Sequence, residues 1–497
     1  GNDTLISIVN TTERGKAVKI RFIEAMNSRE VLDFNIYMSP YDVWTAVVTA
    51  EGEGAKMVTS DTTCTVPYFY DAEAGVGEQE FLTFDFAGDA TDGAPTGVER
   101  TASGYIEVIE MGTLLATPEK KPSAGATYVA WAVKHADGVP GDCDALVNAW
   151  TDYNGGKIPT ADTLGEAWVN DGTVGFDTDR GASGGIYGAA SIINVADGTM
   201  FSYNATAIDG YFAQGDMNHV DPGNLLPSLA SGTNNTSYIF NNGELLTHTW
   251  VNGDEDFTLG AVNAVLTHDK IMNEYVTDAE IGARTEWVVT FPTKHFHVDG
   301  KTDATVIPPF TRGWYNAKTA ADPDWKLACE DLTFKFYDRE ERPDAPQEDE
   351  PTPTPPIVSP APPEEEVTTP TPDIFQLCRE ANVVRFASDE SVPAVSEILK
   401  EPVRTGTKLG YVNFELPYTA GWVAMDLANV DKNSKIFKDG TEIRQAQAKN
   451  GDYLNGLPVV GFAVTTYTNG NIGAGVLANY GGTFAHRATR AVSASAQ

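Results

Sequence analysis

Alternation of apolar and polar residues is the feature of this sequence that most constrains its fold. Val18, Ile20 and Phe22 are apolar, and the charged Lys19 and Arg21 stand between them. A period of two puts successive side chains on opposite faces of a β-strand. The same kind of pattern recurs in residues 32–38, 105–111, 286–291, 332–337, 412–416 and 459–467. The sequence therefore predicts a chain built mainly of half-buried strands.

Clusters of Gly, Asn, Asp and Ser separate these segments, such as residues 170–172 (NDG) and 252–254 (NGD). These residue types tolerate left-handed turns and connect antiparallel strands. We therefore expect an all-β, mainly antiparallel fold, a β-sandwich of jelly-roll-like type. Few short helices are expected, at residues 39–50, 144–150 and 395–399.

One segment differs sharply in composition from the rest of the chain. Of residues 343–372, 11 of 30 are proline, and two acidic triplets lie among them. Such a segment is extended and forms no core. It divides the chain into a large β-sandwich region (residues 1–342), a Pro-rich acidic loop or linker (343–373) and a C-terminal β region (374–497). The last region is expected to complete the first or to pack on it.

The four cysteines bear on that choice between loop and linker. Cys64, Cys143, Cys329 and Cys378 include no C-x-x-C pair, so they predict two disulfides in an oxidising compartment rather than a zinc site. Cys329 and Cys378 flank the Pro-rich segment, and a bridge between them would make it a loop of one continuous sandwich. Cys64 would then pair with Cys143. Four cysteines allow three connectivities, and four free thiols in a cytosolic protein remain the alternative.

The charge of the chain excludes two classes of partner. The 497 residues contain 34 Lys and Arg against 70 Asp and Glu, a formal net charge of −36. Nucleic acids and anionic lipid surfaces repel such a polyanion, and no apolar run reaches the ~18 residues of a membrane helix. We expect neither nucleic-acid binding nor membrane insertion. The start at Gly1, Asn2 and Asp3 is expected of a chain whose signal peptide has been removed.

Calcium is the ligand that this composition favours, because Ca²⁺ binds carboxylate and carbonyl oxygens in loops where glycine lets the chain wrap the ion. Four loops rich in Asp, Asn and Gly are candidates, and none has the spacing of an EF-hand. The candidate ligands are Asp89, Asp92, Glu99, Asp177, Asp179, Asp254, Asp256, Asp431, Asn433 and Asp439.

Catalytic motifs are weak in this sequence. Ser183 lies in a G-x-S-x-G match, but a nucleophile elbow needs a buried strand before it and a helix after it, and neither is predicted there. His295 and His297 would share one face of a strand, yet the further ligands of a cupin-like metal site are lacking. Paired carboxylates cannot be identified by spacing among so many acids. We expect no catalytic residues and no enzyme activity.

Several segments resemble a family of secreted cell-surface proteins of proteobacteria. They are residues 4–48 (TLISIVNTTERGKAVKIRFIEAMNSREVLDFNIYMSPYDVWTAVV), 104–112 (GYIEVIEMG), 192–210 (IINVADGTMFSYNATAIDG) and 286–294 (EWVVTFPTK). The resemblance spans most of residues 4–340 and returns near residues 479–482 (NYGG). It implies an exported protein on the bacterial cell surface or in the extracellular matrix. The family is also similar in character to β-rich subunits of bacterial extracellular filaments, which polymerise with calcium at subunit contacts.

The sequence thus predicts a structural subunit of an extracellular filament or surface layer. Copies of the chain would associate with one another, with Ca²⁺ bridging their acidic surfaces and the N-terminal strand, residues 5–9, adding to a neighbour's sheet. One alternative is a monomeric, calcium-dependent adhesin that binds carbohydrate, such as matrix polysaccharide. A further alternative is a secreted glycoside hydrolase.

Overall fold

A computed structural model describes thirteen stretches of the chain, and strands dominate them, as the alternation predicted. The described residues are 1–88, 91–114, 129–151, 178–216, 218–250, 257–316, 326–340, 375–387, 396–399, 411–415, 418–429, 443–473 and 476–494. Helices in these residues are short: α1 (Val129–Ala132), α2 (Cys143–Thr151), α4 (Phe257–Leu266) and α5 (Lys294–Val298), with the 3₁₀ turns η1 (Phe84–Phe86), η3 (Val98–Ala102) and η5 (Ala279–Ile281). The helix expected at residues 144–150 is confirmed by α2.

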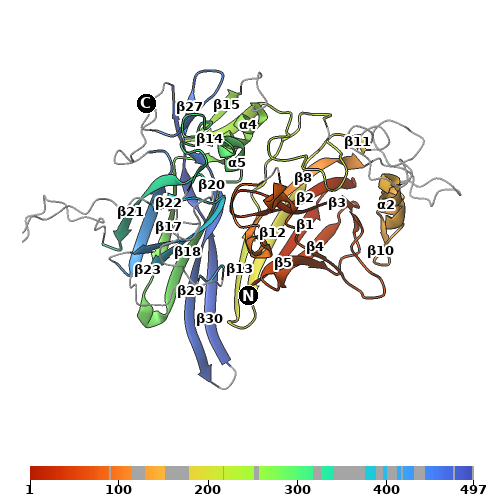
Figure 1. Cartoon of the computed structure of the whole chain (residues 1–497), viewed down its shortest axis with the longest axis horizontal. Helices are drawn as coiled ribbons and strands as arrows, with labels where there is room; N and C mark the ends of the chain where they lie inside the picture. The colour runs from red at the N-terminus through yellow and green to blue at the C-terminus, as the bar shows by residue number, and fades with distance from the viewer. Residues whose placement is uncertain are drawn as a thin grey trace, which may run out of the picture.

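Two sheets form the first half of the molecule, which we call the first body (Figure 1). The first sheet has the order β13 (Thr199–Asn204), β12 (Ile186–Asn194), β1 (Asp3–Asn10), β4 (Val43–Glu51), β5 (Gly54–Thr59) and β7 (Gly77–Glu80). The second has the order β11 (Thr178–Arg180), β8 (Gly104–Leu114), β2 (Lys16–Glu24), β3 (Glu30–Met38) and β6 (Cys64–Val66). Because β1 pairs with β12 on one side and β4 on the other, it has no free edge within its own sheet.

Two further sheets form the second body. The third sheet has the order β22 (Phe375–Leu377), β21 (Glu330–Asp338), β25 (Ala420–Asp426), β17 (Lys270–Val276) and β31 (Arg487–Thr489). The fourth has the order β24 (Tyr411–Glu415), β23 (Ala381–Ala387), β18 (Ala283–Thr290), β29 (Val460–Gly473) and β30 (Val476–Ala485). Strands from both sides of the Pro-rich segment thus share these sheets; residues 343–373 themselves lie outside the described residues.

The remaining strands form small sheets at the periphery. One is three-stranded, β26 (Gln445–Gln447), β27 (Tyr453–Asn455) and β32 (Ala491–Ser493). Four are two-stranded: β9 (His135–Ala136) with β10 (Val139–Pro140), β14 (Thr236–Asn241) with β15 (Glu244–Thr249), β16 (Thr267–His268) with β28 (Leu457–Pro458), and β19 (Tyr315–Asn316) with β20 (Lys326–Leu327). Among the described strands, the pairing of β23 with β24 is parallel and the others are antiparallel.

The predicted jelly-roll-like β-sandwich is wrong. In the described residues, five sheets have three or more strands, which is the number of blades in a five-bladed β-propeller. A jelly roll would instead have two large facing sheets. The physical reason is size, because a single hydrophobic core stops growing beyond roughly 250–300 residues. Alternation shows which face of a strand is buried, but it does not show which sheet the strand joins.

The two bodies have separate hydrophobic cores. In the first body, Ile8 and Trp44 of the first sheet pack against Ile20 and Phe34 of the second. The second core contains residues of the third and fourth sheets, among them the fully buried Trp287. A third cluster, with Phe201 of β13 and Phe462 of β29 as its largest members, joins the bodies. Figure 1 shows the β29–β30 ribbon running beside β13 and beyond it.

One expected helix is a strand instead. Residues 39–50 were expected to begin a helix at Ser39 and Pro40, yet the structure has β4 there. Trp44 and Ala46 of β4 face the core, while the β-branched Val43 and Thr45 lie on the opposite face. Of the third expected helix, residues 396–399 are described, and they form a turn.

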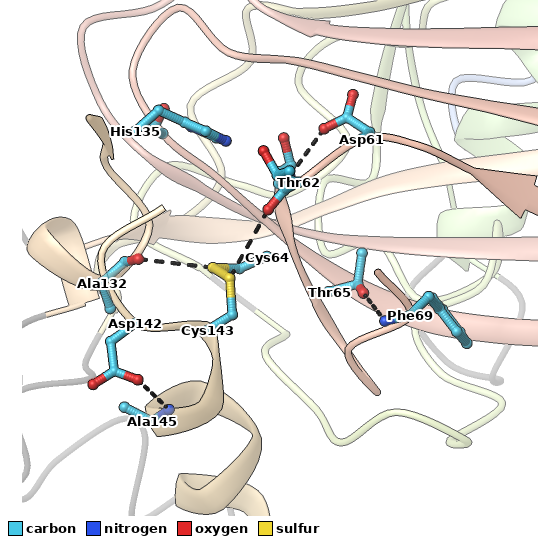
Figure 2. Close-up of a disulfide and its surroundings, with 12 residues drawn as sticks. Asp61, Thr62, Cys64, Thr65, Phe69, Ala132, His135, Asp142, Cys143 and Ala145 are labelled. Carbon is cyan, nitrogen blue, oxygen red and sulfur yellow. Dashed lines mark hydrogen bonds between the residues drawn. A yellow bond between two sulfur atoms is a disulfide. The ribbon is translucent and has the colours of Figure 1, made fainter. Parts of the chain in front are cut away.

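Both disulfides are present, so the prediction of two bridges is confirmed. Cys64 of β6 is bonded to Cys143, the first residue of α2, with Cα atoms 5.2 Å apart (Figure 2). Cys329 is bonded to Cys378, which joins the start of β21 to the end of β22. Each bridge stabilises the fold by about 4 kcal/mol if the loss of loop entropy in the unfolded chain is the dominant effect.

Candidate functional site

Asp92 is a calcium candidate that the structure places in the interior. Its carboxylate is fully buried, with Oδ2 accepting a hydrogen bond from Asn27 Nδ2 at 2.9 Å and Oδ1 accepting one from the amide of Ala94 at 2.9 Å. The Arg100 guanidinium contacts both oxygens. Burial disfavours ionisation, but Arg100 and the hydrogen bonds outweigh it and hold the pKa of Asp92 below its ordinary value. Protein donors thus occupy the oxygens that would bind an ion.

The other calcium candidates are not brought to Asp92. Glu99 is exposed on η3, and Asp179 lies in β11. Asp89, Asp177, Asp254, Asp256, Asp431, Asn433 and Asp439 lie outside the described residues. Within the residues described, no three or more His, Cys, Asp or Glu side chains are arranged to hold a metal ion. Calcium binding therefore stays a prediction.

The G-x-S-x-G match is a turn between strands, and a network around Glu110 fixes its shape. The turn joins β11 to β12, and no helix follows it. The Glu110 carboxylate accepts hydrogen bonds from the amides of Ser183 and Gly184 at 2.9 and 2.7 Å. Lys16 Nζ lies 2.7 Å from Glu110 Oε1 and 2.6 Å from Ser183 Oγ. Since Lys16 Nζ donates its hydrogen bond to Ser183 Oγ, it is not placed as the base that a serine nucleophile needs.

His295 and His297 do not share a strand face. Both lie in the short helix α5, which follows β18 after Pro292. His297 is buried, with Nε2 2.8 Å from Asn263 Nδ2 and Nδ1 3.1 Å from the carbonyl oxygen of Ile307. Burial lowers the pKa of His297 to about 4. The expected strand geometry is therefore wrong, and His297 is a neutral core residue.

The outer face of the first sheet is a site that the sequence reading missed. Three cross-strand rows of side chains point away from the first core. They are Tyr187, Val9 and Val43; Ala189, Ser7 and Thr45; and Ser191, Leu5 and Val47. We call these nine residues the uncharged face. In a chain of net charge −36, a sheet face with no Asp, Glu, Lys, Arg or His across three rows is unusual.

A shallow groove of about 400 Å³ runs across the uncharged face. Leu5, Ser7, Thr45, Val47, Ala189 and Ser191 line it, together with Val58, Thr59 and Ser60 at the end of β5, and none of the lining residues is charged. Leu5 is 43% exposed and Tyr187 53% exposed. The hydroxyl of Ser191 lies 2.7 Å from that of Ser202, and Thr59 Oγ1 donates to the carbonyl oxygen of Thr45 at 2.7 Å. The groove therefore carries hydroxyl groups but no charge.

Charged groups lie around the uncharged face rather than on it. Lys56 Nζ forms ion pairs with Glu51 and Glu78 at 2.8 and 2.9 Å on the β5 side. Asp61 accepts hydrogen bonds from the amide and hydroxyl of Thr45 at 2.9 and 3.1 Å. An apolar centre with a polar rim is the arrangement of many protein interfaces. Residues 4–12, 43–50 and 181–196 contain no charged residue, and this signal in the sequence could have identified the face.

No match to this chain is found among protein families, curated proteins or solved structures. In the part of the chain that the structure describes, no helix has the length and hydrophobicity needed to cross a membrane.

Proposed function

We propose that this protein is a non-catalytic structural subunit of an extracellular bacterial filament or surface layer, and that copies associate through the uncharged face. The observation that carries the proposal is the groove without charge on an otherwise strongly acidic chain. Two copies, each of net charge −36, repel one another wherever their carboxylates approach. Contact through a face that carries no charge avoids most of that repulsion.

The second element of the proposal is calcium. Around the contact, acidic surfaces of neighbouring copies still approach one another, and a Debye length of about 8 Å screens them only in part. Divalent ions bridging these carboxylates reduce the remaining repulsion, since carboxylate oxygens are the ligands that Ca²⁺ prefers. The two disulfides support a location outside the cell, because such bonds persist in oxidising compartments.

One part of the expected assembly is corrected. The N-terminal strand was expected to add to a neighbour's sheet, yet β1 is paired along both edges within its own sheet. Contact between copies therefore uses the face of β1 rather than its edge. Leu5 and Ser7 are its contributions to that face.

Self-association is tested by placing one charge in the groove. Ser7→Asp puts a carboxylate at the centre of each contact, and we expect it to abolish assembly in calcium, as seen by light scattering and negative-stain electron microscopy. The matched control is Ala74→Asp, which adds the same charge to an exposed turn away from the groove. Thermal unfolding of both variants verifies that they fold. Equal assembly of the two variants, or a monomeric wild-type protein in millimolar calcium, would refute the proposal.

A second candidate is a carbohydrate-binding adhesin that uses the same groove. The observation in its favour is Tyr187, whose exposed ring lies beside a row with the Ser7 and Thr45 hydroxyls. Sugars commonly combine apolar faces with hydrogen-bonding edges, and a groove of this size suits such a ligand. Binding on a glycan array by the monomeric protein, lost in Tyr187→Ala, would favour the adhesin over the filament subunit.

A further inference from the structure

A buried lysine in the second sheet lies beside a buried aspartate of the neighbouring strand. Lys19 of β2 and Asp33 of β3 have side chains that are 0% and 4% exposed, and Lys19 Nζ is 2.9 Å from Asp33 Oδ1. In the register of the two strands, Lys19 pairs with Asn35 and Arg21 with Asp33, so Lys19 and Asp33 are diagonal neighbours on one face. An amine and a carboxyl group are thus held together away from water.

A second carboxyl group completes the cluster. Glu30 lies at the start of β3, and its side chain is hydrogen-bonded to that of Asp33. Burial, together with the charge of Asp33, raises the pKa of Glu30 to about 8, although Arg21 Nε lies 2.6 Å from Glu30 Oε2 and opposes the rise. Glu30 therefore keeps its proton at neutral pH, next to the Asp33 carboxyl.

Burial also acts on the amine. It lowers the pKa of Lys19 below its ordinary value, although Asp33 favours the charged form. Lys19 Nζ donates further hydrogen bonds to the carbonyl oxygens of Asp221 and Asn224 at 2.9 and 3.2 Å, which fix its position. The amide of Gly223 donates to Asp33 Oδ1 at 2.7 Å.

We propose that Lys19 and Asp33 condense to form an intramolecular isopeptide bond between Lys19 Nζ and Asp33 Cγ, with Glu30 as the group that transfers the proton. The observation behind this proposal is the juxtaposition of an amine, its carboxyl target and a second, hydrogen-bonded carboxyl group in the interior of the second sheet. No such bond is needed for the proposed assembly, so the two proposals stand independently.

The reaction balances without any other reactant. Within the pair, a proton passes from the Lys19 ammonium to the Asp33 carboxylate. The amine nitrogen then adds to Asp33 Cγ, and a new N–C bond forms. Glu30 delivers a proton to the departing oxygen of Asp33 and takes one from the amine nitrogen, so that one C–O bond breaks and one water leaves. The product is an amide. One cation and one anion disappear, and the net charge is unchanged.

The geometry suits this addition. A carbonyl C–O bond is about 1.23 Å long, so Asp33 Cγ lies within about 4.1 Å of Lys19 Nζ, close to the separation of about 3–3.5 Å in reactive complexes. The Gly223 amide is aimed at the oxygen on which negative charge develops, which is the role of an oxyanion-hole donor. The buried site excludes the water that would reverse the reaction.

Lys16 and Glu110 provide a matched comparison within the same sheet. Lys16 Nζ lies 2.7 Å from Glu110 Oε1, and the Lys16 side chain is 0% exposed. The Glu110 carboxylate accepts hydrogen bonds from two backbone amides, those of Ser183 and Gly184. Among the described partners of Glu110 there is no second carboxyl group that could transfer protons, so this pair stays an ion pair.

Mass spectrometry of the intact, reduced protein tests the proposal. The expected mass is lower than that of the linear sequence by one water, and tryptic digestion is expected to yield a branched peptide joining Lys19 to Asp33, since trypsin does not cleave at an acylated lysine. Peptides containing Lys16 and Glu110 are expected to remain unlinked. A full sequence mass with cleavage after Lys19 would overturn the proposal and leave a buried ion pair.

Variants separate the role of each group. Lys19→Arg and Asp33→Ala should both show the full mass, and Glu30→Gln should retain more than 90% of the unlinked form. Because the wild-type mass alone decides whether the bond exists, a variant that fails to fold does not weaken the test. A branched peptide in folded Glu30→Gln at wild-type yield would overturn the role of Glu30.

Discussion

The Arg100 guanidinium contacts the carboxylates of both Glu24 and Asp92, and all three side chains are at most 1% exposed. Its NH2 group lies 2.8 Å from Glu24 Oε1. Glu24 in turn accepts hydrogen bonds from the amides of Met26 and Asn27 at 2.6 and 2.9 Å, so its carboxylate also fixes the turn between β2 and β3. One cation therefore neutralises two buried acids and joins that turn to η3.

Replacing this cation is expected to destabilise the protein strongly. Arg100→Met removes the closest cation from two buried carboxylates, and Arg29 Nε, 3.9 Å from Asp92 Oδ2, replaces it only in part. Breaking a buried pair in this way costs about 3–5 kcal/mol. Chemical denaturation at pH 7 measures the loss. Adding Glu24→Gln and Asp92→Asn to Arg100→Met should recover part of the stability, because the uncompensated charges are removed. A loss below about 1 kcal/mol in the single variant would contradict this account.

Stability should depend on pH through Glu380, which is buried at the junction of the two bodies. Its nearest cation is Lys294, whose Nζ lies 4.0 Å from Glu380 Oε1. Burial raises the pKa of Glu380 to about 8 against the charge of Lys294, and Asp299 and Glu24 add to the rise. The folded state thus holds a proton that the unfolded chain releases near pH 4.5. This contribution to stability is complete below pH 4.5 and is lost as the pH rises to about 8.

Glu380→Gln should therefore make the protein more stable at pH 8, by at least about 1 kcal/mol, and should flatten the fall in stability between pH 4.5 and 8. The matched control is Glu330→Gln. Burial opposes ionisation of Glu330, but Arg444 and Thr311 outweigh it and lower its pKa, so its contribution to stability is present at neutral pH and is lost as the pH falls. Urea unfolding across this pH range checks both variants. A stabilising Glu330→Gln would contradict the assignment.

The disulfide between Cys64 and Cys143 should hold α2 against the second sheet. The bridge spans 79 residues, and the double variant Cys64→Ala, Cys143→Ala should lose about 4 kcal/mol if loop entropy dominates. Guanidinium unfolding under non-reducing conditions measures this. A reductant should then destabilise the wild-type protein by more than the double variant, which retains the Cys329–Cys378 bridge. Equal effects of reductant on both proteins would contradict a stabilising role of the first bridge.

Strand content could be predicted from the sequence because alternation depends on local order alone. The charged Lys19 and Arg21 alternate with the apolar Val18, Ile20 and Phe22, and the segment is β2 as expected. The assignment of strands to sheets could not be predicted, because it depends on contacts between distant residues. β18, for example, pairs with β23 and β29, which follow it by about 100 and 180 residues along the chain.

The burial of charged side chains could not be predicted from the sequence either. Lys19 and Arg21 read as the solvent face of a half-buried strand, yet every residue of β2 is buried, because charged partners on β3 and β8 lie opposite them. A sequence shows each charge but not the register that pairs it. The uncharged face is different, because its runs without charge are visible in the sequence. Only their adjacency in one sheet required the structure.

Aromatic side chains of β13 and β29 pack together where the two bodies meet. Phe201 of β13 is 1% exposed and packs against β30, where a Cβ atom added to Gly481 would lie 2.5 Å from the Phe201 ring. The rings of Tyr203 and Phe462 are stacked, with centroids 4.3 Å apart. Since each body has its own core, we expect these rings to contribute strongly to the coupling of the two cores, beside the smaller cluster that joins Met26 and Ala94 to Cys329 and Cys378.

The double variant Phe201→Ala, Phe462→Ala should therefore lower stability and also uncouple the bodies. Large-to-small changes of buried aromatics cost about 3–5 kcal/mol each. We expect calorimetry to resolve two transitions in this variant and one in the wild-type protein. The control is Phe86→Ala, which removes a fully buried ring from the first core and leaves the contact intact. It should lower stability while the two bodies still unfold in a single transition. A single transition in the double variant would show that other contacts couple the two cores.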